Sequence, residues 1–195
     1  MPLDLLWILA AVVVLLIAGV WLFFKKKAGP SIPEALRPGQ PLPDFAVADE
    51  QGNPIRSVQL VGSAAVMLFV RGNWCPFCTR QVADLTTHYK DIVDLGARLI
   101  FVTPKPLETT RRVAEFFEVE FDFWLDDELK AAKQLGLVMP SGVPGDHQKE
   151  YGQDTVWPTA LVIDSAGIIR FAKLSRMVID RPDPKSLLDE LKKIS

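Results

Sequence analysis

The chain has few cysteines and no excess of either charge. Its 195 residues include two cysteines, and 22 Lys and Arg stand against 24 Asp and Glu, for a net charge of −2. Two cysteines are too few for a small scaffold held by several disulfides. The balanced charge excludes the basic surface typical of a nucleic-acid-binding protein. A composition that is 49% hydrophobic excludes a disordered chain, and the length predicts one domain.

The hydrophobic residues are unevenly distributed. Residues 5–24 (LLWILAAVVVLLIAGVWLFF) carry no charge, and about 20 apolar residues in a helix span the roughly 30 Å of a bilayer's hydrocarbon core. A cleaved signal peptide is the alternative, but the segment has no basic region before it and no cleavage motif after it. We therefore expect a transmembrane anchor over residues 1–24, which contacts the membrane through residues 5–24.

The residues after the apolar run predict an orientation and a linker. Three lysines, Lys25, Lys26 and Lys27, follow the run, whereas Asp4 precedes it. The positive-inside rule then places the rest of the chain in the cytoplasm, with an extracytoplasmic location as the alternative. Residues 25–43 contain five of the fifteen prolines, which favours an extended spacer. The sequence thus predicts a Lys/Pro-rich linker over residues 25–43 and a folded domain over residues 44–195.

The remaining sequence predicts alternating strands and helices. Apolar runs between turn residues predict strands at 45–48, 55–59, 64–70, 98–103, 121–125, 159–164 and 168–173. Helical spacing and capping residues predict helices from Pro76 to Gly96, at 108–117, at 126–135 and after Asp183-Pro184. Residues 138–154, rich in Gly and Pro, are expected to form a loop. This order indicates an α/β fold with a mixed central sheet flanked by helices.

The two cysteines form a CxxC motif at a predicted strand-to-helix junction. Residues three apart in the first turn of a helix share one face, so the sulfurs of Cys75 and Cys78 can meet. The helix N-terminus favours the thiolate of Cys75, and Pro76 suits the first helical position. We expect Cys75 to be an exposed nucleophile and Cys78 to be a buried resolving thiol. The redox group is this dithiol, with no added cofactor.

Other interpretations of the motif are weaker. A structural disulfide would close too small a loop to stabilise the fold much. A zinc site needs two more ligands, and the chain has only His88 and His147 to offer. We therefore expect no metal, a surface position for His88, and a loop with His147 and Tyr151 at the border of the site.

Arg71 lies four residues before Cys75 and has two interpretations. Its charge either lowers the pKa of the Cys75 thiol or holds a peroxide oxygen, or else the side chain extends to solvent. A second element is Trp157-Pro158-Thr159, directly before a predicted strand. A cis peptide at Pro158 would place the backbone against the CxxC helix and leave the N–H and C=O of Trp157 for a substrate chain.

Two stretches resemble a known family. Residues 69–78 (FVRGNWCPFC) are similar to the R-G-x-W-C-P-[FY]-C block of peroxiredoxin-like proteins, in the redoxin (AhpC/TSA-type) branch of the thioredoxin fold. Trp157-Pro158-Thr159 resembles the family's cis-proline loop. The resemblance implies an α/β thioredoxin-like domain, here preceded by one transmembrane helix, with Cys75 as nucleophile, Cys78 as resolving thiol and Pro158 as the substrate-side cis-proline. The candidate substrate contacts are Trp74, Pro76, Phe77, Trp157 and Thr159.

Two departures from the pattern affect the predicted function. Peroxiredoxins carry Thr or Ser three residues before the reactive cysteine, where this chain has Gly72, and thioredoxins keep a buried acid where it has Phe69. We therefore expect a membrane-anchored thiol–disulfide oxidoreductase that exchanges disulfides with protein partners and binds no nucleic acid. One alternative is a thiol peroxidase with antioxidant activity, in which Cys75 passes through sulfenic acid. The other is a non-enzymatic, membrane-tethered binding module centred on Trp157.

Overall fold

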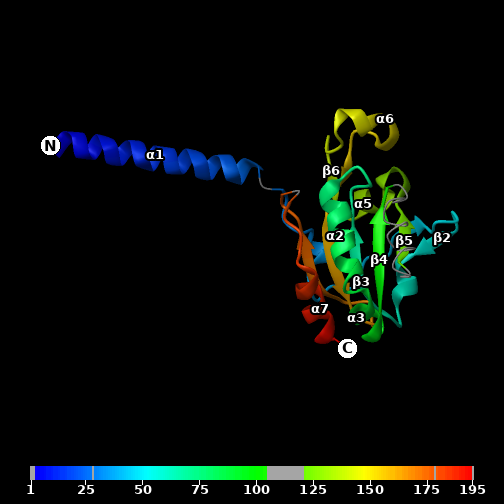
Figure 1. Cartoon of the computed structure of the whole chain (residues 1–195). Coiled ribbons are helices and arrows are strands. Elements are labelled where there is room, and N and C mark those ends of the chain that lie inside the picture. Colours follow the sequence, from blue (N-terminus) through cyan, green and yellow to red (C-terminus); the bar gives the residue numbers. More distant parts are fainter. Residues whose placement is uncertain (1–2, 28, 105–120, 178, 195) are drawn as a thin grey trace. The chain divides into compact units, whose positions relative to one another are not determined.

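The N-terminal helix is a separate unit of the chain. The structure, a computed structural model, describes residues 3–27, 29–104, 121–177 and 179–194 and divides into two compact units, Met1–Pro30 and Ser31–Ser195. Helix α1 (Leu3–Lys27) forms the first unit (Figure 1). Large apolar side chains along it, such as Trp7, Leu15 and Leu16, are exposed. Within the described residues, no helix combines the length and the apolar character that crossing a membrane requires, so the predicted transmembrane anchor is not supported by the structure.

The second unit is built on a mixed seven-stranded sheet. The strand order is β2-β1-β5-β4-β3-β8-β9. The central strands β3, β4 and β5 are parallel, whereas β8 and β9 run antiparallel to them and β1 pairs antiparallel with both β2 and β5. The strands are β1 (Ala46–Ala48), β2 (Pro54–Arg56), β3 (Ala64–Phe69), β4 (Ala97–Thr103), β5 (Asp122–Leu125), β8 (Thr159–Ile163) and β9 (Ile169–Leu174). The predicted mixed α/β sheet and both predicted hairpins are confirmed.

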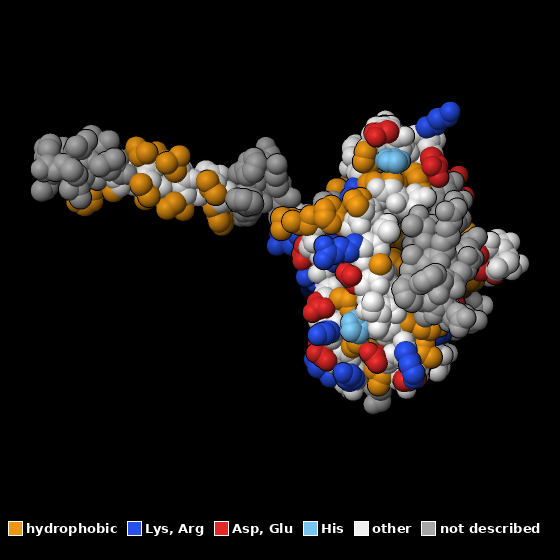
Figure 2. All heavy atoms as spheres, viewed as in Figure 1, with side chains coloured by type: hydrophobic (Ala, Val, Ile, Leu, Met, Phe, Trp, Pro, Cys, Tyr) orange, Lys and Arg blue, Asp and Glu red, His pale blue; other side chains and the backbone are white. Residues whose placement is uncertain are grey.

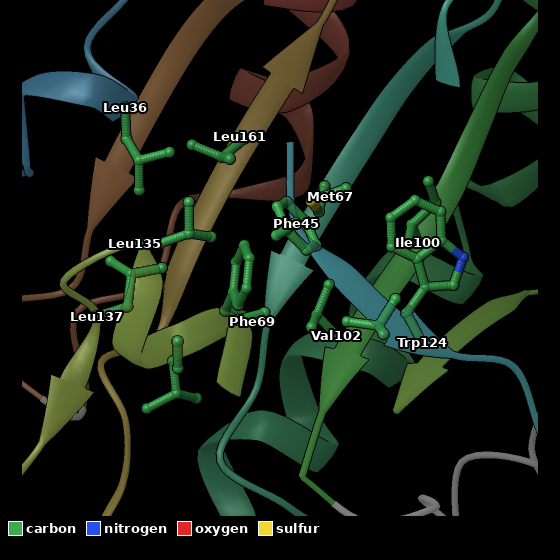
Figure 3. Close-up of a cluster of buried hydrophobic side chains, with 14 of the residues drawn as sticks. Leu36, Phe45, Met67, Phe69, Ile100, Val102, Trp124, Leu135, Leu137 and Leu161 are labelled. Atoms are coloured by element: carbon green, nitrogen blue, oxygen red, sulfur yellow. The ribbon is translucent and has the colours of Figure 1, made fainter. Parts of the chain in front are cut away.

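Strand β3 is buried on both faces because its residues alternate between two cores. Met67 and Phe69 enter one cluster, which Figure 3 shows together with Leu36 and Trp124. Val66 and Leu68 enter the other cluster, on the opposite face of the sheet. A continuous apolar run is what a strand covered on both faces requires. The chain passes from this strand through residues 70–74 to the two cysteines.

In the part of the chain that the structure describes, the second face is covered by α2 (Pro76–Thr86), α3 (Tyr89–Asp94) and α7 (Pro184–Lys192). Asp183 caps α7 through the Lys185 N–H, as expected. The single helix predicted up to Gly96 is wrong, because α2 ends before His88. The hydroxyls of Thr86 and Thr87 donate to the carbonyls of Val82 and Asp84 at 3.0 and 2.7 Å. Such local bonds compete with the helical ladder.

The helix predicted at 126–135 begins later than expected. Glu128 and Leu129 have φ angles of 55° and 56°, which breaks the helix, and α5 spans only Lys130–Gln134. The Asp126 carboxylate nevertheless caps it, since it accepts the N–H groups of Ala131 and Ala132 at 2.7 and 2.9 Å. Burial raises the pKa of Asp126, against these hydrogen bonds. The helix predicted at 108–117 lies outside the described residues.

The segment predicted as a loop at 138–154 contains short elements. Strand β6 (Val138–Met139) pairs antiparallel with β7 (Thr155–Val156), and helix α6 (Gln148–Tyr151) lies between them (Figure 1). Strands of two residues leave no periodicity in a sequence, which is why the pattern did not reveal them. The pairing of β6 with β7 fixes both ends of the segment.

The predicted linker is shorter than residues 25–43, because residues 31–43 belong to the folded unit. Leu36 is 0% exposed, within the core of Figure 3. The N–H groups of Gly39 and Leu42 donate to the carbonyls of Ile169 and Gly167 at 2.7 and 2.8 Å, and Ile169 donates to Gln40 at 2.9 Å. The prolines hold an extended backbone, but this backbone lies along the start of β9. The domain therefore begins near Ser31, not near residue 44.

Candidate active site

The CxxC motif lies at the start of helix α2, and residues 70–74 connect it to the end of β3. Cys75 is the capping residue and Pro76 the first helical residue. The N–H of Cys75 donates to the carbonyl of Gly72 at 3.3 Å, and the carbonyl of Cys75 accepts the N–H of Cys78 at 3.0 Å. Gly72 has a φ of +125°, a conformation that only glycine adopts readily. The tight turn that places Cys75 at the helix start therefore depends on Gly72.

The two sulfur atoms are in hydrogen-bond contact. Cys78 Sγ donates to Cys75 Sγ at 2.9 Å, and both cysteines are free thiols. Each cysteine is 1% exposed. The prediction of a buried Cys78 is confirmed, and the prediction of an exposed Cys75 is wrong, because Cys75 belongs to the second buried cluster, against which the side chain of Trp74 packs. The pair is therefore poised for disulfide formation in a site closed to large molecules.

The pKa values of the two thiols are shifted in opposite directions. The hydrogen bond from Cys78, helped by the charges of Arg71 and Arg181 and opposed by burial, lowers the pKa of Cys75 to about 6. That hydrogen bond, burial and the negative charge of Cys75 raise the pKa of Cys78 well above its ordinary value. These shifts favour the thiolate form of Cys75 near neutral pH and the protonated form of Cys78.

Arg71 points inward, which decides between its two interpretations. It is only 6% exposed, and its guanidinium donates to the carbonyl of Gly142 and lies 4.4 Å from the centroid of the Trp74 ring. Its backbone N–H donates to Cys78 Sγ at 3.5 Å. Arg71 is thus a fixed positive charge beside both cysteines, and its side chain does not extend to solvent.

A second arginine, Arg181, reaches the same site and was missed by the sequence analysis. Its Nη2 donates to Cys78 Sγ at 3.7 Å across a separation of 103 residues. Arg181 precedes α7 in a segment with no motif, so the sequence held no signal that would have found it. Together with Arg71 it places two positive charges around the sulfur pair.

The segment between β6 and β7 borders the site, as expected of the loop with His147 and Tyr151. His147 stacks on the Trp74 ring, with centroids 5.9 Å apart and planes at 22°. Tyr151 meets the same ring edge-on at 6.4 Å, and its hydroxyl donates to the amide oxygen of Asn73. The Thr155 hydroxyl donates to the Arg71 carbonyl at 3.3 Å. This segment therefore holds Trp74 and Arg71 in place.

The predicted cis peptide at Pro158 is wrong. The Trp157–Pro158 bond is trans, as are the other peptide bonds of the described residues. The Trp157 N–H donates to the Leu137 carbonyl at 2.6 Å, because the pairing of β6 with β7 continues to this point. The Trp157 carbonyl accepts the Thr159 hydroxyl at 2.9 Å. The backbone of Trp157 and the hydroxyl of Thr159 are therefore engaged within the fold and unavailable to a substrate.

Pro158 nevertheless lies at the end of the sheet where β3 ends and the chain leads to the CxxC motif. Thr159 pairs with Phe69 in the antiparallel register of β8 and β3, so continuing this register brings Pro158 beside Val70, just before Arg71. The Pro158 carbonyl accepts the N–H of Ser175 at 2.8 Å. Its position matches the expectation from the sequence, whereas the conformation and the free backbone do not.

Pro76 and Phe77, the two residues between the cysteines, lie on the surface. Phe77 is 39% exposed and lines a cavity of about 300 Å³ with Ile179 and Arg181 among its other walls. Figure 2 shows positive and negative side chains interspersed on the visible face of this unit.

No group of three His, Cys, Asp or Glu residues converges within the described part of the chain, and His88 instead contacts Asp91 at 3.4 Å.

A reactive dithiol at a helix start, on a central sheet of mixed strands, defines a thiol-based redox enzyme of thioredoxin-like fold. The comparison with known sequences gives the family: residues 38–172 match the AhpC/TSA family, and the chain belongs to it. The redox chemistry of this family is carried by cysteine thiols. A non-enzymatic binding module is therefore the wrong interpretation.

The relatives of the chain are distant peroxiredoxins. The chain is 23% identical to the chloroplastic peroxiredoxin Q of Sedum lineare over 175 residues, which cover 88% of this chain and 86% of that protein. It is 26% identical to the peroxiredoxin Bcp of Bacillus subtilis over 99 residues, 51% of this chain and 63% of that one.

Solved structures confirm the fold. Peroxidoxin BcpB from Mycobacterium tuberculosis aligns with a TM-score of 0.65 at 20% identity, over 82% of this chain and 99% of that one. A thiol:disulfide interchange protein DsbE from Chlorobium tepidum, described as putative, aligns with a TM-score of 0.58 at 19% identity, over 82% and 98% of the two chains. At these identities the likeness concerns the fold alone.

Proposed function

We propose that the protein is a thiol peroxidase in which Cys75 attacks a hydroperoxide and Cys78 resolves the product as an internal disulfide. The observation that carries the proposal is the sulfur pair itself. The sulfurs are 2.9 Å apart, with the pKa of Cys75 lowered to about 6 and that of Cys78 raised. The kinship with peroxiredoxins supports the same conclusion.

The reaction proceeds in three steps. The Cys75 thiolate attacks one oxygen of ROOH, the O–O bond breaks, hydroxyl is transferred to sulfur as sulfenic acid, and RO⁻ leaves and takes a proton from water. The Cys78 thiol then attacks the oxidised sulfur, which forms the Cys75–Cys78 disulfide and releases one water. An external dithiol, oxidised in turn to its disulfide, returns both cysteines to thiols.

The burial of the site favours a small oxidant. Because Cys75 is 1% exposed, a small peroxide needs less rearrangement to reach it than a protein disulfide does. The short distance between the sulfurs also means that the second step requires no large conformational change.

The test is rapid mixing of the reduced full-length protein with hydrogen peroxide. We expect one disulfide per chain, formed much faster than free thiols of ordinary pKa react, and no reaction in Cys75→Ser. Cys78→Ser is the matched variant, and it should consume one peroxide and accumulate sulfenic acid that dimedone traps. Oxidation of wild type no faster than that of a small thiol would reject the peroxidase.

A second candidate is thiol–disulfide exchange with protein partners, favoured by the exposed Phe77 at the mouth of the motif and by the missing hydroxyl at Gly72. It predicts reduction of insulin by wild type and mixed disulfides on Cys75 in Cys78→Ser. If the protein reacts with peroxide but gives neither result, thiol–disulfide exchange is rejected and only the peroxidase function stands.

Attachment to a membrane through residues 5–24 is a further proposal. It is supported by the uncharged sequence and by the exposed apolar side chains on α1 (Figure 2). The opposing observation is that no helix of the described residues is long and apolar enough to cross a membrane. Resistance of the full chain to extraction by carbonate supports the anchor, and release into the supernatant overturns it. With the anchor, Lys25–Lys27 predict a cytoplasmic domain, which a reporter fused after Ser195 tests.

A further inference from the structure

Hydrogen-bond donors without acceptors are concentrated around the two cysteines. Of six buried side-chain polar atoms that have no hydrogen-bond partner among the described residues, four belong to residues at this site. These atoms are Arg71 Nε, Trp74 Nε1, and Arg181 Nε and Nη1. All four are donors, and each buried donor left unsatisfied costs free energy. Buried donors that have no acceptor within the protein are available to a ligand that carries acceptor atoms.

The donors of Arg71 and Trp74 are held rigidly. Arg71 is 6% exposed, and its guanidinium is fixed by the Gly142 carbonyl and by the face of the Trp74 ring, 4.4 Å away. His147 and Tyr151 pack on the same ring. A donor that is already oriented before the substrate arrives costs no reorganisation when charge develops in the transition state.

The indole nitrogen occupies the space that a side chain at position 72 would need. A Cβ built on Gly72 would lie 3.1 Å from Trp74 Nε1 and 2.8 Å from Tyr151 Cε1. The Gly72 carbonyl in turn accepts the N–H of Cys75 at 3.3 Å, so this space adjoins the turn that carries the nucleophile. The indole N–H of Trp74 therefore borders position 72, the position at which this chain carries no hydroxyl.

The ligand chemistry follows from the donors and their surroundings. The site offers neutral and cationic N–H groups, is closed to large molecules and contains a thiolate. A hydroperoxide fits, because it is small, carries acceptor lone pairs on both oxygens and develops negative charge on the leaving oxygen when the O–O bond breaks.

We infer that Trp74 Nε1–H and Arg71 Nε–H bind the oxygens of the hydroperoxide beside Cys75, with the indole N–H of Trp74 in place of the hydroxyl that position 72 lacks. This inference rests on the proposed peroxidase function and adds a catalytic role for Trp74. Trp74 donates a hydrogen bond to the leaving oxygen and keeps its proton; the proton on RO⁻ comes from water. Arg71 adds a positive charge on the same side.

Trp74→Phe tests the role of the N–H, because it keeps an aromatic ring for Arg71 and His147. We expect the rate constant of Cys75 with hydrogen peroxide to fall at least about 10-fold, as removal of one oriented donor does. The rate constant with iodoacetamide and the pKa of Cys75 should not change, since alkylation needs the thiolate but no support for a leaving oxygen. An equal fall in both rate constants would show a structural role and overturn the inference.

Trp124→Phe is the matched control. Trp124 also has a buried Nε1 without a partner among the described residues, but it lies in the core on the other face of the sheet. The Trp124→Phe variant should keep the wild-type rate constants with hydrogen peroxide and with iodoacetamide. A fall in its peroxide rate constant equal to that of Trp74→Phe would overturn the inference.

The two proposals fail in different ways. If wild type is alkylated normally but reacts slowly with peroxide, the peroxidase function fails and the inference fails with it. If wild type reacts rapidly and Trp74→Phe reacts equally fast, the function stands and only the role of Trp74 is overturned.

Discussion

The guanidinium of Arg71 donates a hydrogen bond to the carbonyl of Gly142, across 71 residues of sequence. This contact ties the chain just after the central strand β3 to the segment between β6 and β7, which also packs on Trp74. A charge that acts on the Cys75 thiolate is thus positioned by a distant part of the chain.

The hydrogen bond from Cys78 is the largest cause of the lowered pKa of Cys75. Cys78→Ala should therefore raise the pKa of Cys75 by about 1 unit or more, roughly 1.4 kcal/mol per unit. Cys78→Ser keeps a hydroxyl donor and should raise it less. The measurement is the pH dependence of iodoacetamide alkylation, and equal values for the two variants would contradict the assigned cause.

The rate of alkylation of wild-type Cys75 should follow a single titration with a midpoint near pH 6. Because the pKa is lowered to about 6, the thiolate form increases as pH rises through 6 and is the main form at neutral pH. Cys78, whose pKa is raised, should stay unreactive across this range. Mass spectrometry of the alkylated peptide assigns the label, and a midpoint above pH 8 would be inconsistent with the site described.

Removal of either arginine should make Cys75 a weaker acid. Both charges favour the thiolate, and a nearby opposite charge shifts a pKa by about 1–3 units. We expect Arg71→Ala and Arg181→Ala each to move the alkylation midpoint upward. Arg80→Ala is the control, since Arg80 is an exposed residue on the same helix, paired with Asp84, and it should leave the midpoint in place.

Gly72→Ala should destabilise the protein more than Gly62→Ala. Both glycines have positive φ, +125° and +104°, and a side chain in that region costs roughly 1–2 kcal/mol. A Cβ on Gly62 meets nothing within 4 Å, whereas on Gly72 it would lie 2.8 Å from Tyr151 Cε1. Urea unfolding of both variants measures the difference, and equal losses would show that the loop simply moves aside.

Leu36→Ala should cost about 2–5 kcal/mol of unfolding free energy, the usual range for a buried leucine, because Leu36 is 0% exposed. Leu15→Ala, at a leucine of α1 that is 71% exposed, is the control and should cost far less. A Leu36 variant as stable as wild type would mean that residues 31–43 are a free linker after all.

The sequence predicts the parts of the fold that repeat over several residues. The apolar run that became β3 and the Asp183-Pro184 start of α7 follow local rules, and the spacing of Cys75 and Cys78 fixed their shared helical turn. These features depend on neighbours in the chain, so a pattern contains them.

The remaining features depend on contacts between distant residues. Arg181 approaches Cys78 from 103 residues away, and no local pattern records that distance. The Trp157 N–H meets the Leu137 carbonyl through a strand pairing that no pattern revealed, and Cys75 is buried in a cluster to which several elements of the chain contribute. The sequence thus predicted where Pro158 and Cys75 lie, but neither the peptide conformation of Pro158 nor the exposure of Cys75.

The backbone of residues 39–42 along the start of β9 has a consequence for solubility. Strand β9 is the last strand of the sheet, and an outer strand with free N–H and C=O groups is a template for pairing with another chain. Hydrogen bonds with Gly39, Gln40 and Leu42 occupy such groups at Gly167 and Ile169. The proline-rich segment thereby shields part of this edge from intermolecular strand addition and aggregation.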